Sequence, residues 1–286
     1  MVGGKFILKG EVLDHMSIKK MMKIVGICLI AIILRSLLQF LIPAGNQTIL
    51  EQSEFVKNGT LPMVFMLYGL IAFIVLTLIF IEIQKGMGGK KQIKGLKIGL
   101  LYSLIWTAFL IEPLPHGSFI DLFSYPLADG IVLIFLGLMT GIFLSESSPN
   151  KKYHPSSNTK FNIVIFTLLF AAGRLILYNY FHKYSMFKEN QAKTLFWVIF
   201  TGVVIGFMFD YLDSTISITG PVRRSLLFGG IYFGINLFFF NFFLPLVLKV
   251  SLVDLITRTS MDTIFVVFAC LFLNFRASRV TITVPN

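Results

Sequence analysis

The chain alternates long apolar runs with short polar connections. Eight of the runs are long enough to cross a membrane, because a transmembrane helix needs roughly 20 mostly apolar residues. They cover about residues 23–42, 62–83, 97–114, 126–146, 161–181, 194–213, 225–248 and 258–275. The connections between them are too short to hold a soluble domain. This pattern predicts an all-α integral membrane protein with about eight transmembrane helices.

The composition points the same way. Of the 286 residues, 56% are hydrophobic and 14% are charged, whereas a soluble domain has about 45–50% apolar and about 25% charged residues. Such an excess cannot be buried in one soluble core, so a soluble globular enzyme, a disordered chain and a collagen-like chain are all excluded. Because the only cysteines are Cys28 and Cys270, a disulfide scaffold is excluded as well.

The segments outside the runs are short. Residues 1–22 carry lysines among apolar residues, which is typical of a basic interfacial segment. A cleaved signal peptide is not expected here, because the apolar run begins late and contains Arg35. Residues 276–286 are predicted to form a cytoplasmic tail.

The distribution of Lys and Arg predicts the orientation. If the N-terminus is cytoplasmic, 17 of the 25 basic residues fall inside and 6 outside, with Arg35 and Arg174 within spans. The positive-inside rule then favours a multi-pass protein of the plasma membrane with both termini cytoplasmic. The net charge of +11 is attributed to basic residues that set the orientation of the chain in the membrane and attract anionic headgroups on the cytoplasmic side. It is not interpreted as a nucleic-acid site.

Several stretches in the first half of the chain resemble stretches in the second half. FIDLFSYPLADGI (119–131) matches LVDLITRTSMDTI (252–264), with the same spacing between aspartates, and GLLYSLIWTAF (99–109) matches GGIYFGINLFF (229–239). LRSLLQFLI (34–42) likewise lies over GRLILYNYF (173–181), with Arg35 over Arg174, and Glu82 at the end of the second span falls opposite Asp210 at the end of the sixth.

Because rare charged residues recur in the same order, the sequence predicts two four-helix repeats, 23–146 and 161–275. Each contains an even number of spans, so the two repeats are expected to be parallel, with a site at their interface. The alternative is a duplication that produced only a stable bundle.

Four charges are predicted inside the bilayer. Arg35 and Arg174 lie roughly 10 Å below the outer surface, while Asp129 and Asp262 lie one turn inside the fourth and eighth spans. Charged side chains at mid-membrane cost about 2.5–3.5 kcal/mol each, so they are expected to pair. We predict Arg35 with Asp129 and Arg174 with Asp262, or the same pairs crossed between the repeats.

These charges have two interpretations, which can both hold. In the first they line a cavity open to the outside, where the arginines attract an anionic group or the aspartates carry a proton or cation. In the second each pair holds two helices together, and the helix dipole favours an acid in the first turn without any function.

Further polar, aromatic and small residues are assigned by position. Asp121 and Asp254 are expected at the outer rim, and Trp197, Tyr178 and Tyr180 in the outer aromatic belt. The acids at the cytoplasmic helix ends, expected to pair with Lys85 or Arg223, are Glu82, Asp210 and Asp213. The small-residue steps expected to pack inside the bundle are Gly137 with Gly141, Gly202 with Gly206, and Gly230 with Gly234.

The usual catalytic and metal signatures are missing. There is no HExxH and no CxxC, and the histidines lie at span ends or in connections. Glu112, His116 and Asp121 offer a small outer metal site, but the prolines at 113 and 115 break the helical spacing. We therefore assign no catalytic residue, cofactor or metal.

The function predicted from these features is a transporter or permease-like binder of a small or lipid-like solute at the interface between the repeats. Arg35 and Arg174 suggest that the solute carries an anionic group. One alternative is a membrane-embedded enzyme that acts on a lipid, with the outer acids and His116 as acid and base. Another is a non-catalytic subunit or assembly factor of a larger complex. A partner protein or a second copy of the chain also remains an open expectation.

Overall fold

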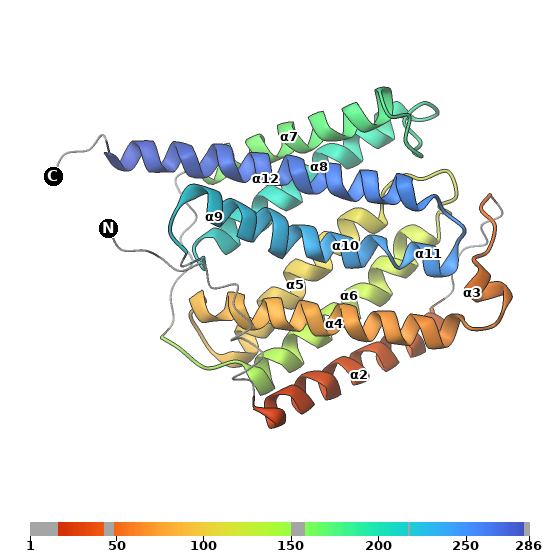
Figure 1. Ribbon diagram of the computed structural model, residues 1–286, viewed down its shortest axis with the longest axis horizontal. Helices are drawn as coiled ribbons and strands as arrows, with labels where there is room; N and C mark the ends of the chain where they lie inside the picture. Colours follow the sequence, from red (N-terminus) through yellow and green to blue (C-terminus); the bar gives the residue numbers. More distant parts are fainter. Residues whose placement is uncertain (1–16, 43–48, 150–157, 217, 283–286) are drawn as a thin grey trace.

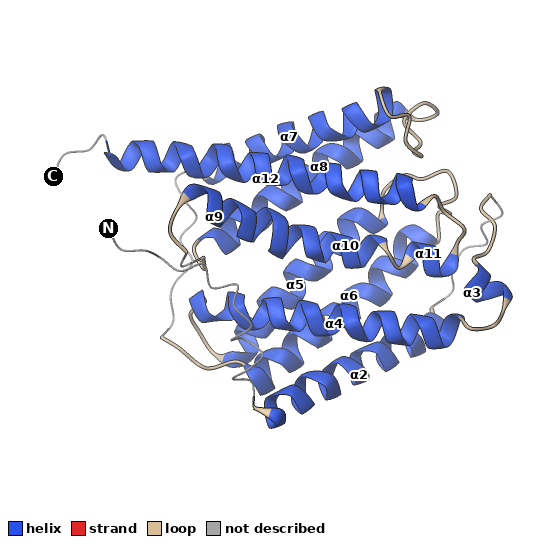
Figure 2. Cartoon of the chain, in the orientation of Figure 1, coloured by secondary structure: helices blue, strands red, loops and turns tan. Residues whose placement is uncertain are grey.

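The computed structural model describes residues 17–42, 49–149, 158–216 and 218–282, and the regular structure in them is helical (Figure 2). Eight helical spans are long and apolar enough to cross a membrane, as predicted. The chain is therefore an all-helical, multi-pass membrane protein. Seven spans are single helices: α2 (Ile18–Leu41), α4 (Leu61–Gly86), α5 (Lys91–Leu110), α6 (Asp121–Leu144), α7 (Thr159–Asn179), α8 (Gln191–Asp213) and α12 (Leu252–Ile282).

The seventh span, Pro221–Val247, is composite. It consists of α9 (Pro221–Ser225), the π-helix η1 (Leu226–Ile235), α10 (Asn236–Asn241) and α11 (Leu244–Val247). A short helix α3 (Glu54–Lys57) precedes α4. A π-helix is usually a single turn inserted in an α-helix, so this longer stretch makes the seventh span the most irregular of the eight.

Several helices extend beyond the predicted apolar runs. α2 begins at Ile18 because lysines near its start keep their charges in water while the helix continues, and α12 continues past 275 to Ile282. Residues 1–16 of the predicted interfacial segment lie outside the described residues. Because α6 begins at Asp121 and α12 at Leu252, Asp129 and Asp262 lie at least two turns inside their helices. The expected single turn is therefore wrong, and the helix dipole, which acts within the first turn, does not explain these acids.

The spans pack into one bundle (Figure 1). Among the first four spans, α2 packs against α4 and α6, and α5 packs against α6. Among the second four, α7 packs against α8 and α12, and α12 covers α9, η1 and α10. Contacts between α5 and α8, and between α4 and α11, connect the two groups of four.

Glycines allow the closest helix contacts. A Cβ added at Gly137 would lie 2.6 Å from both the Gly95 carbonyl oxygen and Gly99 Cα, so α5 and α6 touch through their backbones. On α8, Gly202 and Gly206 lie equally close to the α7 backbone. The pair Gly230 and Gly234, which was also expected to pack inside the bundle, behaves differently. No atom lies within 4 Å of a Cβ added at Gly230, and of the two only Gly234 packs against α12.

The bundle has two ends, which we name the Glu112 end and the Lys85 end after the residues that mark them. At the Lys85 end Lys85 pairs with Glu82 at 2.6 Å, as predicted. Asp213 pairs at 2.5 Å with Arg224 and not with the expected Arg223, because adjacent helical residues point in different directions. Asp210 accepts hydrogen bonds from two side chains of α7, Thr159 and Asn162.

Candidate functional site

A cluster of four charged side chains is buried at the Glu112 end. Arg174 on α7 donates from Nη2 to Asp262 Oδ2 at 2.5 Å and from Nη1 to Glu112 Oε1 at 2.9 Å. Arg258 Nη2 lies 2.6 Å from the same Glu112 oxygen. None of the four residues is more than 8% exposed. Two positive and two negative charges thus form one chain of contacts, with Glu112 shared between the arginines.

Local sequence explains how the cluster assembles. Arg258 and Asp262 are four residues apart on α12, so they share one face of that helix. Gly173 lets α12 approach α7, because a Cβ there would lie 2.8 Å from the Phe265 ring. Glu112 lies two residues after the end of α5 and reaches the cluster from the first group of four spans.

Aromatic rings surround the Arg174 guanidinium. Its carbon lies 4.7 Å from the centre of the Trp197 ring, 5.5 Å from Phe170 and 5.9 Å from Phe109. Such cation–π contacts are strongest where water is excluded. The Trp197 Nε1 also donates to the Ala108 carbonyl at 2.6 Å, which fixes the indole against α5.

This arrangement corrects the predicted aromatic belt. Trp197 and Tyr178 are each only 3% exposed and face the interior, because they pack around the buried cluster. Tyr180, at 79% exposed, is accessible as a belt residue would be.

The first four spans hold the smaller ion pair. Arg35 on α2 pairs with Asp129 on α6, and its Nη1 donates to Gln39 at 3.2 Å. Arg35 also lies 5.6 Å from the centre of the Phe65 ring. Both predicted contacts, Arg35 with Asp129 and Arg174 with Asp262, are therefore present, each within its own group of four spans and not crossed. Whether these residues bind a solute stays a prediction.

Several polar atoms of the larger cluster have no hydrogen-bond partner among the described residues. They are Arg174 Nε, Arg258 Nε, Asp262 Oδ1 and the hydroxyl of the adjacent Tyr178. A buried polar atom without a partner costs about 1–3 kcal/mol. The cluster therefore has hydrogen-bonding capacity that its own four side chains do not use.

The two rim acids lie in the first turns of their helices and contact other groups. Asp121 accepts a hydrogen bond from the Ser118 hydroxyl at 2.7 Å, and Asp254 lies 3.5 Å from the Lys183 ammonium.

His116, the third residue of the considered metal site, stacks on Tyr184 and its Nδ1 lies 3.2 Å from that hydroxyl. Burial, and then the positive charge of Arg258, lowers the pKa of His116. In the part of the chain that the structure describes, no three or more His, Cys, Asp or Glu side chains gather as metal ligands. Glu112 faces the two arginines.

A second polar contact lies deeper between the two groups of four spans. Trp106 Nε1 on α5 donates to Asn236 Oδ1 at 2.6 Å, where η1 gives way to α10. Asn236 is fully buried, and its Nδ2 has no partner among the described residues. The irregular seventh span therefore places an amide donor without a partner at this interface.

Sequence reasoning missed two members of the cluster. Arg258, at the start of the last predicted run, is one of the six basic residues counted as outside, whereas α12 begins at Leu252 and places Arg258 within the helix. The four-residue spacing between Arg258 and Asp262 indicates that both lie on one face of a helix, and this could have identified Arg258. Glu112 was considered only as a metal ligand, and its contact with two arginines depends on helix packing that the sequence does not display.

Comparison with known proteins adds no assignment. No protein-family model, curated protein or solved structure matches this chain. Functional inference therefore rests on the geometry and charge of the site.

Proposed function

We propose that this protein is a transporter or permease-like binder that moves a small or lipid-like solute with an anionic group between its two groups of four spans. The buried cluster is the observation that carries the proposal: Glu112 of the first group is held by Arg174 and Arg258 of the second. Ionisable residues inside a membrane protein are rare and costly, and they commonly mark solute or ion pathways. If the charges served only to join α7 to α12, the pair of Arg174 and Asp262 would be sufficient. Glu112 and Arg258 would not be needed.

Contacts between corresponding residues support the two parallel repeats, 23–146 and 161–275. Trp106 and Asn236 occupy the same position in the aligned segments 99–109 and 229–239, and they hydrogen-bond to each other. Equivalent residues meet in this way next to a twofold axis.

A second set of contacts supports the same symmetry. Trp197, on the second span of its repeat, donates to the Ala108 carbonyl on the third span of the other repeat. Tyr68 makes the reciprocal contact, with its hydroxyl 3.0 Å from the Phe239 carbonyl oxygen. At the Glu112 end, Ser53 N donates to the Val247 carbonyl at 3.0 Å, which joins the first connection of one repeat to the third connection of the other. The amide of residue 186 donates to the carbonyl of residue 113 in the reciprocal connections.

The cluster then serves as a gate at one end of the interface. Separating the repeats at this end breaks both contacts of Glu112 and leaves Arg174 and Arg258 with unused donors. Arginine binds carboxylate and phosphate oxygens through several N–H groups at once. An anionic solute would therefore replace the Glu112 carboxylate on the two arginines as the gate opens.

Charge distribution supports an outward-facing Glu112 end in the plasma membrane. Exposed lysines gather at the Lys85 end, among them Lys19, Lys23, Lys90 and Lys91. By the positive-inside rule that end is cytoplasmic, where it also faces anionic headgroups.

Flux in sealed proteoliposomes tests the proposal. With labelled inorganic phosphate, glycerol 3-phosphate and succinate as probes, we expect uptake of at least one by the wild type and at least tenfold slower uptake by Arg258→Gln. That variant leaves Glu112 with a single cationic partner and removes half of the arginine site for the anion. Lys57→Gln is the matched control, because Lys57 is a surface cation at the same end, paired with Glu54 at 3.1 Å. Equal uptake by wild type and Arg258→Gln, or no uptake of any anion, would contradict the proposal.

A further inference from the structure

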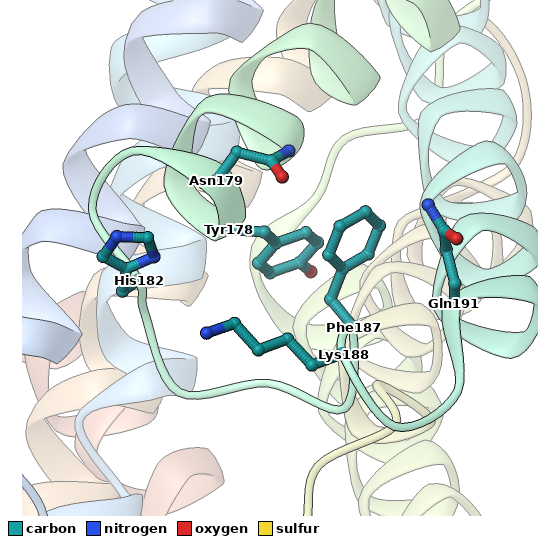
Figure 3. A pocket seen from close by; sticks show the side chains of 6 residues that line it. All are labelled: Tyr178, Asn179, His182, Phe187, Lys188 and Gln191. Atoms are coloured by element: carbon teal, nitrogen blue, oxygen red, sulfur yellow. The ribbon is translucent and has the colours of Figure 1, made fainter.

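A pocket of about 250 Å³ opens at the Glu112 end, between the end of α7 and the start of α8. Figure 3 shows its six lining side chains, which come from both helices and from the connection between them. They are Tyr178, Asn179, His182, Phe187, Lys188 and Gln191.

The pocket is basic. In Figure 3 the Lys188 ammonium extends across the opening toward the His182 ring. Within the described part of the chain neither side chain forms an ion pair, and no acid lines the pocket. Gln191 is the first residue of the 23-residue helix α8, whose N-terminus adds partial positive charge. A lysine ammonium, an imidazole and a helix N-terminus together favour a phosphate group.

The inner wall of the pocket is aromatic. Tyr178 and Phe187 stack with ring centres 5.1 Å apart. Tyr178 is only 3% exposed, and its hydroxyl has no hydrogen-bond partner among the described residues. These rings provide an apolar surface beside the charges, and they match a ligand that joins a phosphate to an apolar part.

The pocket also lies next to the ion cluster. Tyr178 follows Arg174 by one turn of α7, so it contributes to both environments. Tyr178 is therefore the residue that the pocket and the surroundings of the cluster share.

We propose that the pocket is the site where the solute is first captured, and that it binds a phosphate group that carries an apolar part. The inference rests on the proposed transport function and names the substrate class. A phospholipid headgroup in the same leaflet and a soluble organic phosphate have this chemistry in common.

Binding measurements on the purified full chain separate these sources. The probes are phenyl phosphate added to detergent solution, and phosphatidylglycerol compared with phosphatidylcholine in mixed micelles. The test variant is Lys188→Gln combined with His182→Asn; asparagine is chosen because residue 182 has a φ of 47°, which asparagine tolerates. Both residues are exposed, so the variant is expected to fold.

We expect at least one probe to raise the thermal midpoint of the wild type, and the double variant to bind it at least tenfold more weakly. Lys193→Gln is the control, since this lysine lies in the first turn of α8 but does not line the pocket. A response to phenyl phosphate indicates a soluble solute, and a response to phosphatidylglycerol alone indicates a lipid.

Three results would overturn the capture site. The double variant binds as tightly as the wild type; neither probe binds the wild type; or Lys193→Gln weakens binding as much as the double variant. If Arg258→Gln abolishes binding while the double variant does not, the ligand sits on the ion cluster. The capture site then fails while the transport proposal stands.

Discussion

Arg174→Gln is expected to lower the free energy of unfolding by about 3–5 kcal/mol, the largest effect of any single substitution considered. Arg174 is 1% exposed and contacts both acids of its cluster. Removing its charge leaves Asp262 without a cationic partner in the membrane interior, while Glu112 keeps only Arg258. Denaturant titration of the protein in mixed micelles measures the change.

A compensating variant separates charge balance from a general loss of packing. Arg174→Met combined with Asp262→Leu removes one positive and one negative charge and leaves Glu112 paired with Arg258, so most of the stability should return. Lys85→Gln breaks an exposed pair at the opposite end and should change stability by less than about 1 kcal/mol. If Arg174→Gln is as stable as the wild type, the cluster is not the buried network described above.

Gly137→Ala is expected to destabilise the bundle by about 1–3 kcal/mol. The new methyl group would meet the backbone of Gly95 and Gly99 at 2.6 Å, and backbone atoms cannot move aside as a flexible side chain can. α5 and α6 would have to separate, and α6 carries Asp129. The thermal midpoint in detergent measures the effect.

Gly26→Ala is the matched control for this substitution. It makes the same chemical change within a helix, but no atom lies within 4 Å of the added Cβ. Its stability should equal or exceed that of the wild type, because alanine is the better helix former. Equal effects of the two substitutions would mean that close α5–α6 contact contributes nothing to stability.

The sequence was sufficient to predict the helices because apolar runs of this length have few alternatives. It also predicted that each arginine meets an aspartate, since buried charges need partners and each half offers few, but it left open whether the pairs cross between the halves. It could not predict that Glu112 joins Arg174 to Arg258. That contact depends on where α5 ends and on how far α12 extends before its apolar run.

Positions of aromatic residues were harder to predict than those of charges. Near a membrane surface, Trp197 and Tyr178 fit an aromatic belt as well as they fit a buried site. A belt residue and a buried residue differ only in the direction in which the side chain leaves its helix. The sequence does not reveal that direction, because apolar residues occur on all sides of these helices. The pocket beside Tyr178 was likewise invisible, because its residues come from two helices and their connection.

The most direct test of the account is the thermal midpoint of Glu112→Gln compared with that of the wild type, each titrated with phosphate and carboxylate anions. If an anion competes with Glu112 for Arg174 and Arg258, neutralising Glu112 removes the competitor. The anion is therefore expected to bind the variant at least tenfold more tightly, with a larger rise of the midpoint above the variant's own baseline. Weaker or unchanged anion binding in Glu112→Gln would contradict the claim that Glu112 closes an anion site between the two groups of spans.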